Sequence, residues 1–247
     1  GLYVRLEFVG AKEAGLFGHT KNATIRNLTV SGSVSIDTLS ASDSAGGIVG
    51  MAEGGTIENC GNLCTVRGST AGGIAGETVN VTVSGCYNGG RISSGYDAAG
   101  IVGYFGGGSG KIYDCYNVGT VHGALTAGGI IIGAAGIGVA YNCYNTATVT
   151  SGYAYGISYK VDAINCFLLK GGTADPKAKE KTAEEFANGT VLALLKAGER
   201  GNNADPWADE CKYVAAAGKT LPMFKWQTGD AHTHDQSSEW QSNDVQH

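Results

Sequence analysis

Hydrophobic residues in the first two thirds of this chain come in short runs, three to five residues long and rich in Val, Ile, Thr and Tyr. Gly, Asn or Ser bounds these runs. Such runs between turn residues are typical of β-strands, and no apolar stripe with the 3.6-residue period of a helix occurs before residue 175. We therefore predict a succession of short strands joined by tight turns.

The runs recur with a fixed period. A phrase of small residue, glycine, apolar residues and glycine returns five times within residues 14–133, and a degraded sixth copy occupies residues 154–158. Counted from the glycine before the first large apolar residue, successive copies are 32, 26, 27, 29 and 27 residues apart. A period in this range predicts a solenoid, whose turns bury their apolar faces only by stacking on one another. The anchoring glycines are Gly15, Gly47, Gly73, Gly100, Gly129 and Gly156.

Each repeat also carries a cysteine followed at close range by an asparagine. Turns stacked at about 4.8 Å place like residues over like residues, which predicts an inward column of cysteines. The asparagines are predicted to form a ladder of side-chain amides at a turn, where they would tolerate the left-handed backbone conformation. The two columns are Cys60, Cys86, Cys115, Cys143 and Cys166, and Asn62, Asn88, Asn117 and Asn145.

These patterns predict an all-β solenoid, a right-handed parallel β-helix with a short helical C-terminal cap, because parallel crossover connections are overwhelmingly right-handed. The β-helix is expected over residues 1–169 and the cap over residues 170–227. Thr182 and Glu185 form a capping-box pattern, and we expect the short helices there to cover the last turn. We interpret Trp207 and Trp226 as sealing the same end, a ligand platform being the alternative. Residues 228–247 are polar and are predicted to be a linker or the start of another module.

At these phrases the chain resembles a known repeat family. The phrase GLFG at residues 15–18 and its AGGIVG variants resemble the GLUG motif, and the Asn-Cys-Tyr-Asn phrase is a common continuation of such repeats. GLUG repeats occur in large bacterial surface and secreted proteins, including adhesin-like proteins and some IgA-cleaving metallopeptidases. The resemblance therefore implies an extracellular or cell-wall-attached protein. The metallopeptidase chemistry does not carry over, because it needs an H-E-x-x-H helix and this chain has no His-Glu pair.

The composition argues against some classes of binding partner. The chain has 41 Gly, a net charge of −5 and no run of basic residues, so nucleic acid and anionic membranes are poor candidates. No apolar stretch reaches the roughly 18 residues of a membrane-spanning helix, so we expect no membrane insertion of this segment. The chain opens and closes within a repeat or module, and we interpret it as an excerpt of a longer protein.

Seven cysteines in a secreted protein raise the question of disulfides. Five of them fall at one phase of the repeat, where small apolar residues are wanted, and free cysteine packs as a small hydrophobe. We favour a buried ladder of thiols, with one or more bridges as the alternative. Whether Cys64 or Cys211 is paired stays open.

Few residues suggest catalysis. Glu58 and Asp114 hold nearly the same phase two turns apart, with Ser84 between them, which is a weak basis for the paired carboxylates of a sugar-cleaving enzyme. We expect no catalytic residue, no cofactor and no structural metal. His232 and His234 could hold a metal, but a short tail motif is more simply a solvated linker.

One row of aromatic residues could bind a ligand. Tyr87, Tyr116 and Tyr144 follow the cysteine column by one residue and should point outward, because side chains alternate along a strand. They could form a platform for a glycan or a protein, or they could stack on one another and merely cover the rod. The leading interpretation is a non-enzymatic surface module, an adhesin segment or stalk that binds a host or bacterial glycan or protein. The alternatives are a polysaccharide-active enzyme and a carbohydrate-binding accessory domain of a larger hydrolase or peptidase.

Overall fold

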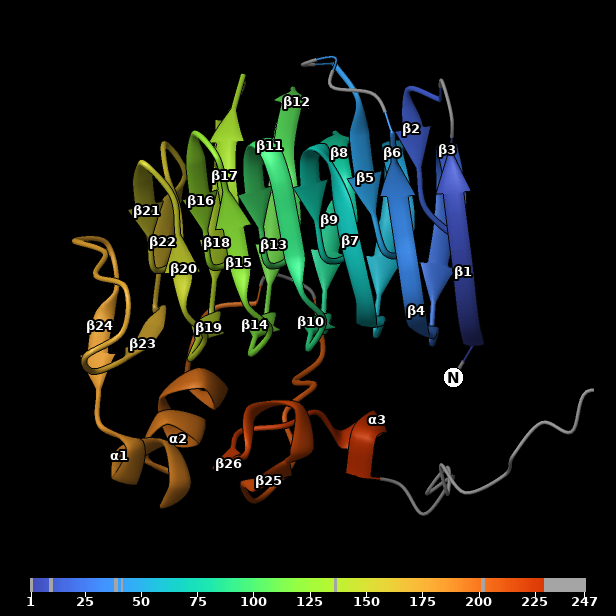
Figure 1. Ribbon diagram of the computed structural model, residues 1–247. Coiled ribbons are helices and arrows are strands. Elements are labelled where there is room, and N and C mark those ends of the chain that lie inside the picture. Colours follow the sequence, from blue (N-terminus) through green and yellow to red (C-terminus); the bar gives the residue numbers. More distant parts are fainter. Residues whose placement is uncertain are drawn as a thin grey trace, which may run out of the picture.

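A computed structural model describes residues 2–8, 11–37, 40, 42–135, 137–200 and 203–228. The chain winds as a parallel β-helix in which each turn passes from one large sheet, sheet A, through a corner to a second, sheet B, and back (Figure 1). Sheet A has 15 strands and sheet B has nine among the described residues. The predicted β-helix is confirmed.

The strands of sheet A recur in successive turns of the solenoid. They are β1 (Leu2–Phe8), β2 (Glu13–Ala14), β4 (Thr29–Ile36), β5 (Ser44–Gly46), β7 (Gly61–Gly72), β10 (Tyr87–Asn88), β11 (Ile92–Ala99), β14 (Tyr116–Asn117), β15 (Val121–Gly123), β16 (Thr126–Gly128), β19 (Tyr144–Asn145), β20 (Val149–Thr150), β21 (Tyr153–Tyr155), β23 (Phe167–Leu169) and β24 (Lys179–Lys181).

Sheet B closes each turn on the other side. Its strands are β3 (Phe17–Arg26), β6 (Val49–Glu58), β8 (Ala75–Val79), β9 (Thr82–Ser84), β12 (Val102–Gly107), β13 (Ser109–Tyr113), β17 (Ile131–Ala134), β18 (Ile137–Tyr141) and β22 (Asp162–Ile164).

The register places the repeated phrases directly over one another. Tyr87 pairs with Tyr116, Tyr116 with Tyr144, and Tyr144 with Phe167, all in parallel strands. The five cysteines of the predicted column are at most 2% exposed and belong to the solenoid core. All seven cysteines are free, so the thiol ladder is confirmed and Cys64 and Cys211 are unpaired. Burial raises the pKa of Cys115 well above its ordinary value, which keeps the thiol protonated and inert.

The glycine of each AGGIVG phrase is needed for close packing between turns. A Cβ on Gly100 would lie 2.1 Å from the carbonyl oxygen of Gly129, so no other residue fits. The apolar residue after each glycine points into the core, as predicted, and is fully buried. These residues are Ile48, Ile74, Ile101, Ile130 and Ile157.

Two polar columns run along the stack where one was predicted. The first is the asparagine ladder, in which Asn62 donates to Asn88, Asn88 to Asn117, and Asn117 to Asn145, at 2.8, 2.7 and 2.8 Å. This ladder is confirmed, but it is buried and its backbone is not left-handed. The left-handed conformation belongs to the residue before each cysteine or its equivalent, with φ between 49° and 59°. We call these residues the left-handed column: Asn27, Asn59, Gly85, Asp114, Asn142 and Asn165.

The C-terminal segment, residues 170–228, first adds β24 to the edge of sheet A beside β23. It then forms α1 (Ala183–Ala187), which starts at the predicted capping box of Thr182 and Glu185, and α2 (Thr190–Lys196). An antiparallel pair, β25 (Lys212–Val214) and β26 (Lys219–Leu221), encloses the 3-10 turn η1 (Ala215–Ala217), and α3 (Lys225–Thr228) follows. Within the described ranges, no helix is long and apolar enough to cross a membrane.

The position of this segment differs from the prediction. Its first part does cover the last turn, since β24 pairs with β23 and Asp175 accepts hydrogen bonds from the backbone of Ile157 and Ser158. The part that follows runs back along the side of the solenoid and packs below β10, β14, β19 and β23 (Figure 1). The physical reason is the outward row of aromatic rings on these strands, which forms one buried apolar cluster with the C-terminal segment. The predicted tail at residues 228–247, including His232 and His234, lies outside the described residues except for Thr228.

Candidate functional site

The predicted tyrosine row points outward from the solenoid core, but it is not open to solvent. Tyr87 is 9% exposed, and Tyr116 and Tyr144 are 0% exposed. The rings stack face to face, with centroids 5.3 Å apart for Tyr87 and Tyr116 and 4.9 Å apart for Tyr116 and Tyr144. An exposed binding platform at these three residues is therefore wrong, because the C-terminal segment occupies the row.

Aromatic residues of the C-terminal segment cover the row one by one. Phe186 lies 5.5 Å from Tyr144, Phe224 lies 5.1 Å from Tyr116, and Trp226 lies 5.7 Å from Tyr87, measured between ring centroids. Trp207 is fully buried and lies near both Tyr116 and Tyr144. Trp207 and Trp226 thus seal an apolar cluster, as interpreted from the sequence, but along the side of the rod.

Hydroxyl groups at the tips of the rings complete this cover. Tyr144 donates its hydroxyl to the carbonyl oxygen of Pro222 at 2.6 Å, and Tyr116 exchanges hydrogen bonds with the side-chain amide of Gln227 at 2.8 and 3.1 Å. Burial raises the pKa of both phenols above the ordinary value, so they stay neutral donors. We call this tyrosine row the docking bed, because the C-terminal segment packs on it. The hydroxyl groups of Tyr116 and Tyr144 are already hydrogen-bonded to that segment.

The left-handed column supplies a second line of contacts to the same segment. Asn142 donates to the carbonyl oxygen of Glu199 at 2.8 Å, and Asn165 donates to that of Leu194 at 2.9 Å. Two turns before Asn142, Gly85 accepts a hydrogen bond from the indole of Trp226 at 3.3 Å through its backbone carbonyl. Successive members of the column therefore hold the segment in register with the turns.

Asp114 is the charged member of this column. Its Oδ1 accepts a hydrogen bond from the indole nitrogen of Trp207 at 2.8 Å and lies 3.1 Å from Nε of Arg200. The side chain is 1% exposed, and Oδ2 has no hydrogen-bond partner among the described residues. Burial raises the pKa of Asp114 to about 7, because desolvation outweighs the opposing effects of Arg200 and Trp207. Asp114 is thus a buried docking residue. Ser84 occupies the turn between Glu58 and Asp114, as the sequence suggested, because it pairs with Glu58 on one side and with Tyr113, the neighbour of Asp114, on the other.

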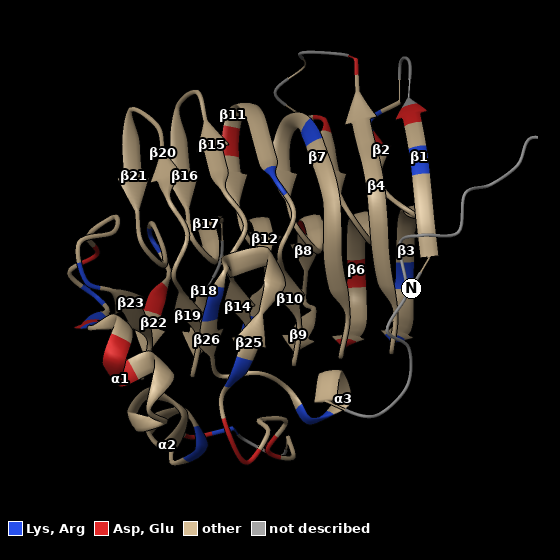
Figure 2. Ribbon diagram, turned by 60° about the horizontal axis from the view of Figure 1, so that its bottom comes forward, with Lys and Arg blue, Asp and Glu red and all other residues tan. Residues whose placement is uncertain are grey.

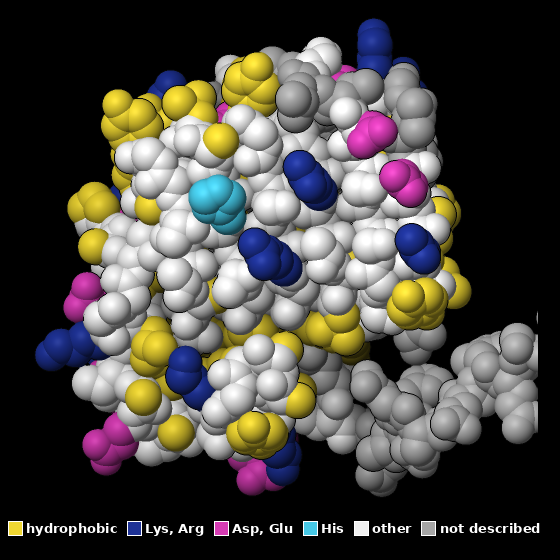
Figure 3. All heavy atoms as spheres, viewed as in Figure 1, with side chains coloured by type: hydrophobic (Ala, Val, Ile, Leu, Met, Phe, Trp, Pro, Cys, Tyr) yellow, Lys and Arg dark blue, Asp and Glu magenta, His cyan; other side chains and the backbone are white. Residues whose placement is uncertain are grey.

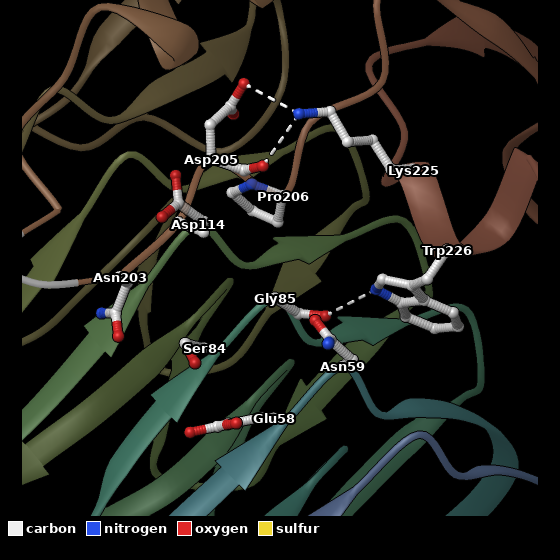
Figure 4. A pocket seen from close by; sticks show the side chains of 11 residues that line it. Glu58, Asn59, Ser84, Gly85, Asp114, Asn203, Asp205, Pro206, Lys225 and Trp226 are labelled. Atoms are coloured by element: carbon white, nitrogen blue, oxygen red, sulfur yellow. Dashed lines mark hydrogen bonds and ion pairs between the residues drawn. The ribbon is translucent and has the colours of Figure 1, made fainter.

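A groove remains open between the solenoid corner and the C-terminal segment (Figure 4). We call it the Trp226 groove. Its volume is about 390 Å³, within the range of small-ligand sites. Glu58, Asn59 and Ser84 approach it from the solenoid, whereas Asn203, Pro206 and Trp226 come from the C-terminal segment.

The register explains why the solenoid side of this groove is polar. Glu58 and Ser84 pair in adjacent strands at the end of sheet B, and Asn59 follows Glu58 in the left-handed column. In the next turn the position that pairs with Ser84 is Tyr113, which is buried and stacks on Tyr141 at 4.9 Å. Of the third turn, Asp114, the residue after Tyr113, still lines the groove.

The part of the chain that the structure describes offers little for catalysis by a metal. No group of three or more His, Cys, Asp and Glu residues there could hold a metal ion. Charged side chains are sparse on most strands and more frequent in the C-terminal segment around α1 and α2 (Figure 2). In the view of Figure 3 they are scattered among uncharged side chains and form no strongly charged patch.

Sequence reasoning found the tyrosine row and both tryptophans but missed the left-handed column and the groove. A signal for the column was present, since the residue before each cysteine is Asn, Gly or Asp, the types that tolerate a left-handed backbone. No comparable signal existed for the groove, because Glu58 and Trp226 are brought together only by the return of the C-terminal segment.

Comparisons with known proteins give one informative match. No family model matches the chain, and no curated protein matches it. Among solved structures, the chain is similar to one described as a putative immunoglobulin A1 protease from Bacteroides ovatus. The TM-score is 0.68 at 20% sequence identity, and the match covers 90% of this chain and 74% of that one. At this identity the likeness shows the fold alone.

Proposed function

We propose that this chain is a non-enzymatic adhesion module of a larger bacterial surface or secreted protein. The motif resemblance and the fold likeness to a protein described as a putative immunoglobulin A1 protease support this setting, since both point to large secreted or surface proteins. Within that setting, the module presents a rigid surface to a glycan or a protein.

The observation that carries the proposal is the return path of the chain. Trp226 contacts Tyr87 in β10, which lies in the middle of the stack, with β1, β4 and β7 on one side and β14, β19 and β23 on the other. The described chain therefore reaches Thr228 beside the middle turns and not beyond the last one (Figure 1). The C-terminal segment widens the rod along one side, and a plain stalk needs no such lateral addition. The geometry favours the adhesin segment over the stalk.

Because the C-terminal segment covers the docking bed, an active site built on the tyrosine row is disfavoured. Asp114, the acid singled out from the sequence, is used to hold Trp207 and Arg200. A peptidase-related role remains the second candidate, because the similar solved structure carries a protease description.

The test uses beads coated with the purified chain. We expect them to adhere to some members of an array of immobilised neutral, sialylated and sulfated oligosaccharides and extracellular matrix proteins. Beads coated with an Ile112→Asp variant, which should not fold, are the control. In parallel, incubation of the soluble chain with immunoglobulin A1 should leave the substrate intact on a denaturing gel. Absence of adhesion to every array member, or appearance of immunoglobulin fragments, would contradict the proposal.

A further inference from the structure

We propose that the Trp226 groove is a binding subsite for one neutral pyranose ring of a glycan. The inference rests on the proposed adhesive function and gives it a place and a ligand class. It is built on the lining of the groove, which combines an aromatic wall with side chains that have no hydrogen-bond partner among the described residues.

The wall comes from the C-terminal segment. The indole of Trp226 is partly exposed, and its nitrogen is held by the carbonyl oxygen of Gly85 at 3.3 Å, which fixes the ring beside the groove. Phe224 packs behind it at 5.9 Å between ring centroids. Pro206 adds apolar surface. Such a rigid aromatic surface suits the apolar face of a sugar ring.

The floor offers hydrogen-bonding groups that the fold does not use. The side chains of Glu58, Asn59, Ser84 and Asn203 are each partly exposed, and none of them has a hydrogen bond or ion pair with another described residue. Together they provide donors and acceptors around the groove (Figure 4). A polyol needs both kinds of partner, whereas an ammonium group would use the carboxylate alone.

The charge of the lining selects against anions. Lys225 is the cation of the groove, and its ammonium group already lies 3.1 Å from the carbonyl oxygen and 3.5 Å from the carboxylate of Asp205. Glu58 has no cationic partner among the described residues. A sialylated or sulfated sugar would meet this carboxylate without a compensating cation, so a neutral ring is expected.

Gly85 is the one member of the left-handed column without a side chain. Asn or Asp occupies every other position of the left-handed column, but Gly85 has no side chain, and a Cβ there would lie 2.5 Å from Oδ1 of Asn59. In the following turns, Asp114 and Asn142 extend into the C-terminal segment and close the gap. The notch at Gly85 is therefore the point at which the column sends no side chain toward the C-terminal segment, and it lets Asn59 lie over Gly85 at the edge of the groove.

Two substitutions test the groove from different sides. Gly85→Asn keeps a residue that tolerates the left-handed backbone but fills the notch, and Glu58→Ala removes the free carboxylate without touching a fold contact. The matched control is Glu184→Ala, an exposed acid outside the groove. Each variant is compared with the parent by thermal unfolding, on the oligosaccharide array, and by saturation-transfer NMR with methyl β-D-glucopyranoside, methyl β-D-galactopyranoside and N-acetylglucosamine.

We expect the parent to bind neutral glycans and to give a saturation-transfer signal with at least one of the three monosaccharides. Glu58→Ala should weaken binding about tenfold, because hydrogen bonds to a charged group are among the stronger ones, and Gly85→Asn should abolish it. Glu184→Ala should bind as the parent does. If Gly85→Asn unfolds, Glu58→Ala alone decides the question.

Other outcomes separate the groove from the proposed function. Equal binding by the parent and both groove variants, or binding only to proteins or anionic glycans, overturns the groove while leaving adhesion intact. No saturation-transfer signal with any of the three sugars also overturns the groove. Failure of the parent to adhere to any array member overturns adhesion itself.

Discussion

The two faces of strand β14 meet different kinds of partner. On the inner side, the repeats contact themselves, as when Asn88 bonds to Asn117, 29 positions later. On the outer side, Tyr116 bonds to Gln227, 111 positions later and outside any repeat. The inner contacts therefore follow from periodicity, whereas the outer ones depend on a segment that carries no periodic signal. A stack of tyrosines cannot by itself tell a ligand surface from a docking bed.

The largest effect is expected from a charge placed on the inner face, which tests whether the inner contacts hold the solenoid together. Ile112→Asp would bury an unpaired carboxylate in the core column, at a cost of about 5 kcal/mol or more. We expect the whole solenoid to lose its cooperative unfolding transition, measured by circular dichroism. Lys111→Asp, one residue away on the exposed face of the same strand, should change the free energy of unfolding by about 0.5 kcal/mol or less. Similar losses for both variants would mean that the assigned register is wrong.

The second substitution acts on the outer face. Tyr116→Ala removes a fully buried ring that stacks on two neighbours, and we expect a loss of about 3–5 kcal/mol. The C-terminal segment should detach while the solenoid stays folded. Cys211 reports this, because its thiol donates to the carbonyl oxygen of Phe186 and is only half-buried. It should react rapidly with a thiol reagent in the variant.

The cysteines of the inner column should stay unreactive in that variant until denaturant is added. Tyr213→Ala, at a side chain that is 67% exposed, is the control and should leave the labelling rate of Cys211 unchanged. If Tyr116→Ala also exposes Cys115, the two faces unfold together and the distinction between them fails.

The sequence predicted the inner face nearly completely because each inward position repeats. The Cys, Ile and Asn columns, the free thiols and the capping box at Thr182 all followed from short-range patterns. The docking of the C-terminal segment could not be predicted, since nothing local says that Trp226 meets Tyr87. The role of Asp114 could not be predicted for the same reason, because its partners Arg200 and Trp207 belong to that segment.

The smallest expected effect concerns Asp114, at the seam where the solenoid and the C-terminal segment meet. The pKa of Asp114 is raised from 3.8 to about 7 by burial, so between these values the folded protein binds more protons than the unfolded chain does. The contribution of Asp114 is therefore most favourable below about pH 4 and is lost as the pH rises toward 7, by about 2 kcal/mol between pH 5 and pH 7. Asp114→Asn, which matches the asparagines elsewhere in the column, should flatten this dependence and be at least as stable as the parent at pH 8. Thermal unfolding of both proteins from pH 5 to pH 8 measures it. Parallel curves for parent and variant would show that Asp114 stays ionised against Arg200 throughout, and that charge pairing, not burial, governs the seam.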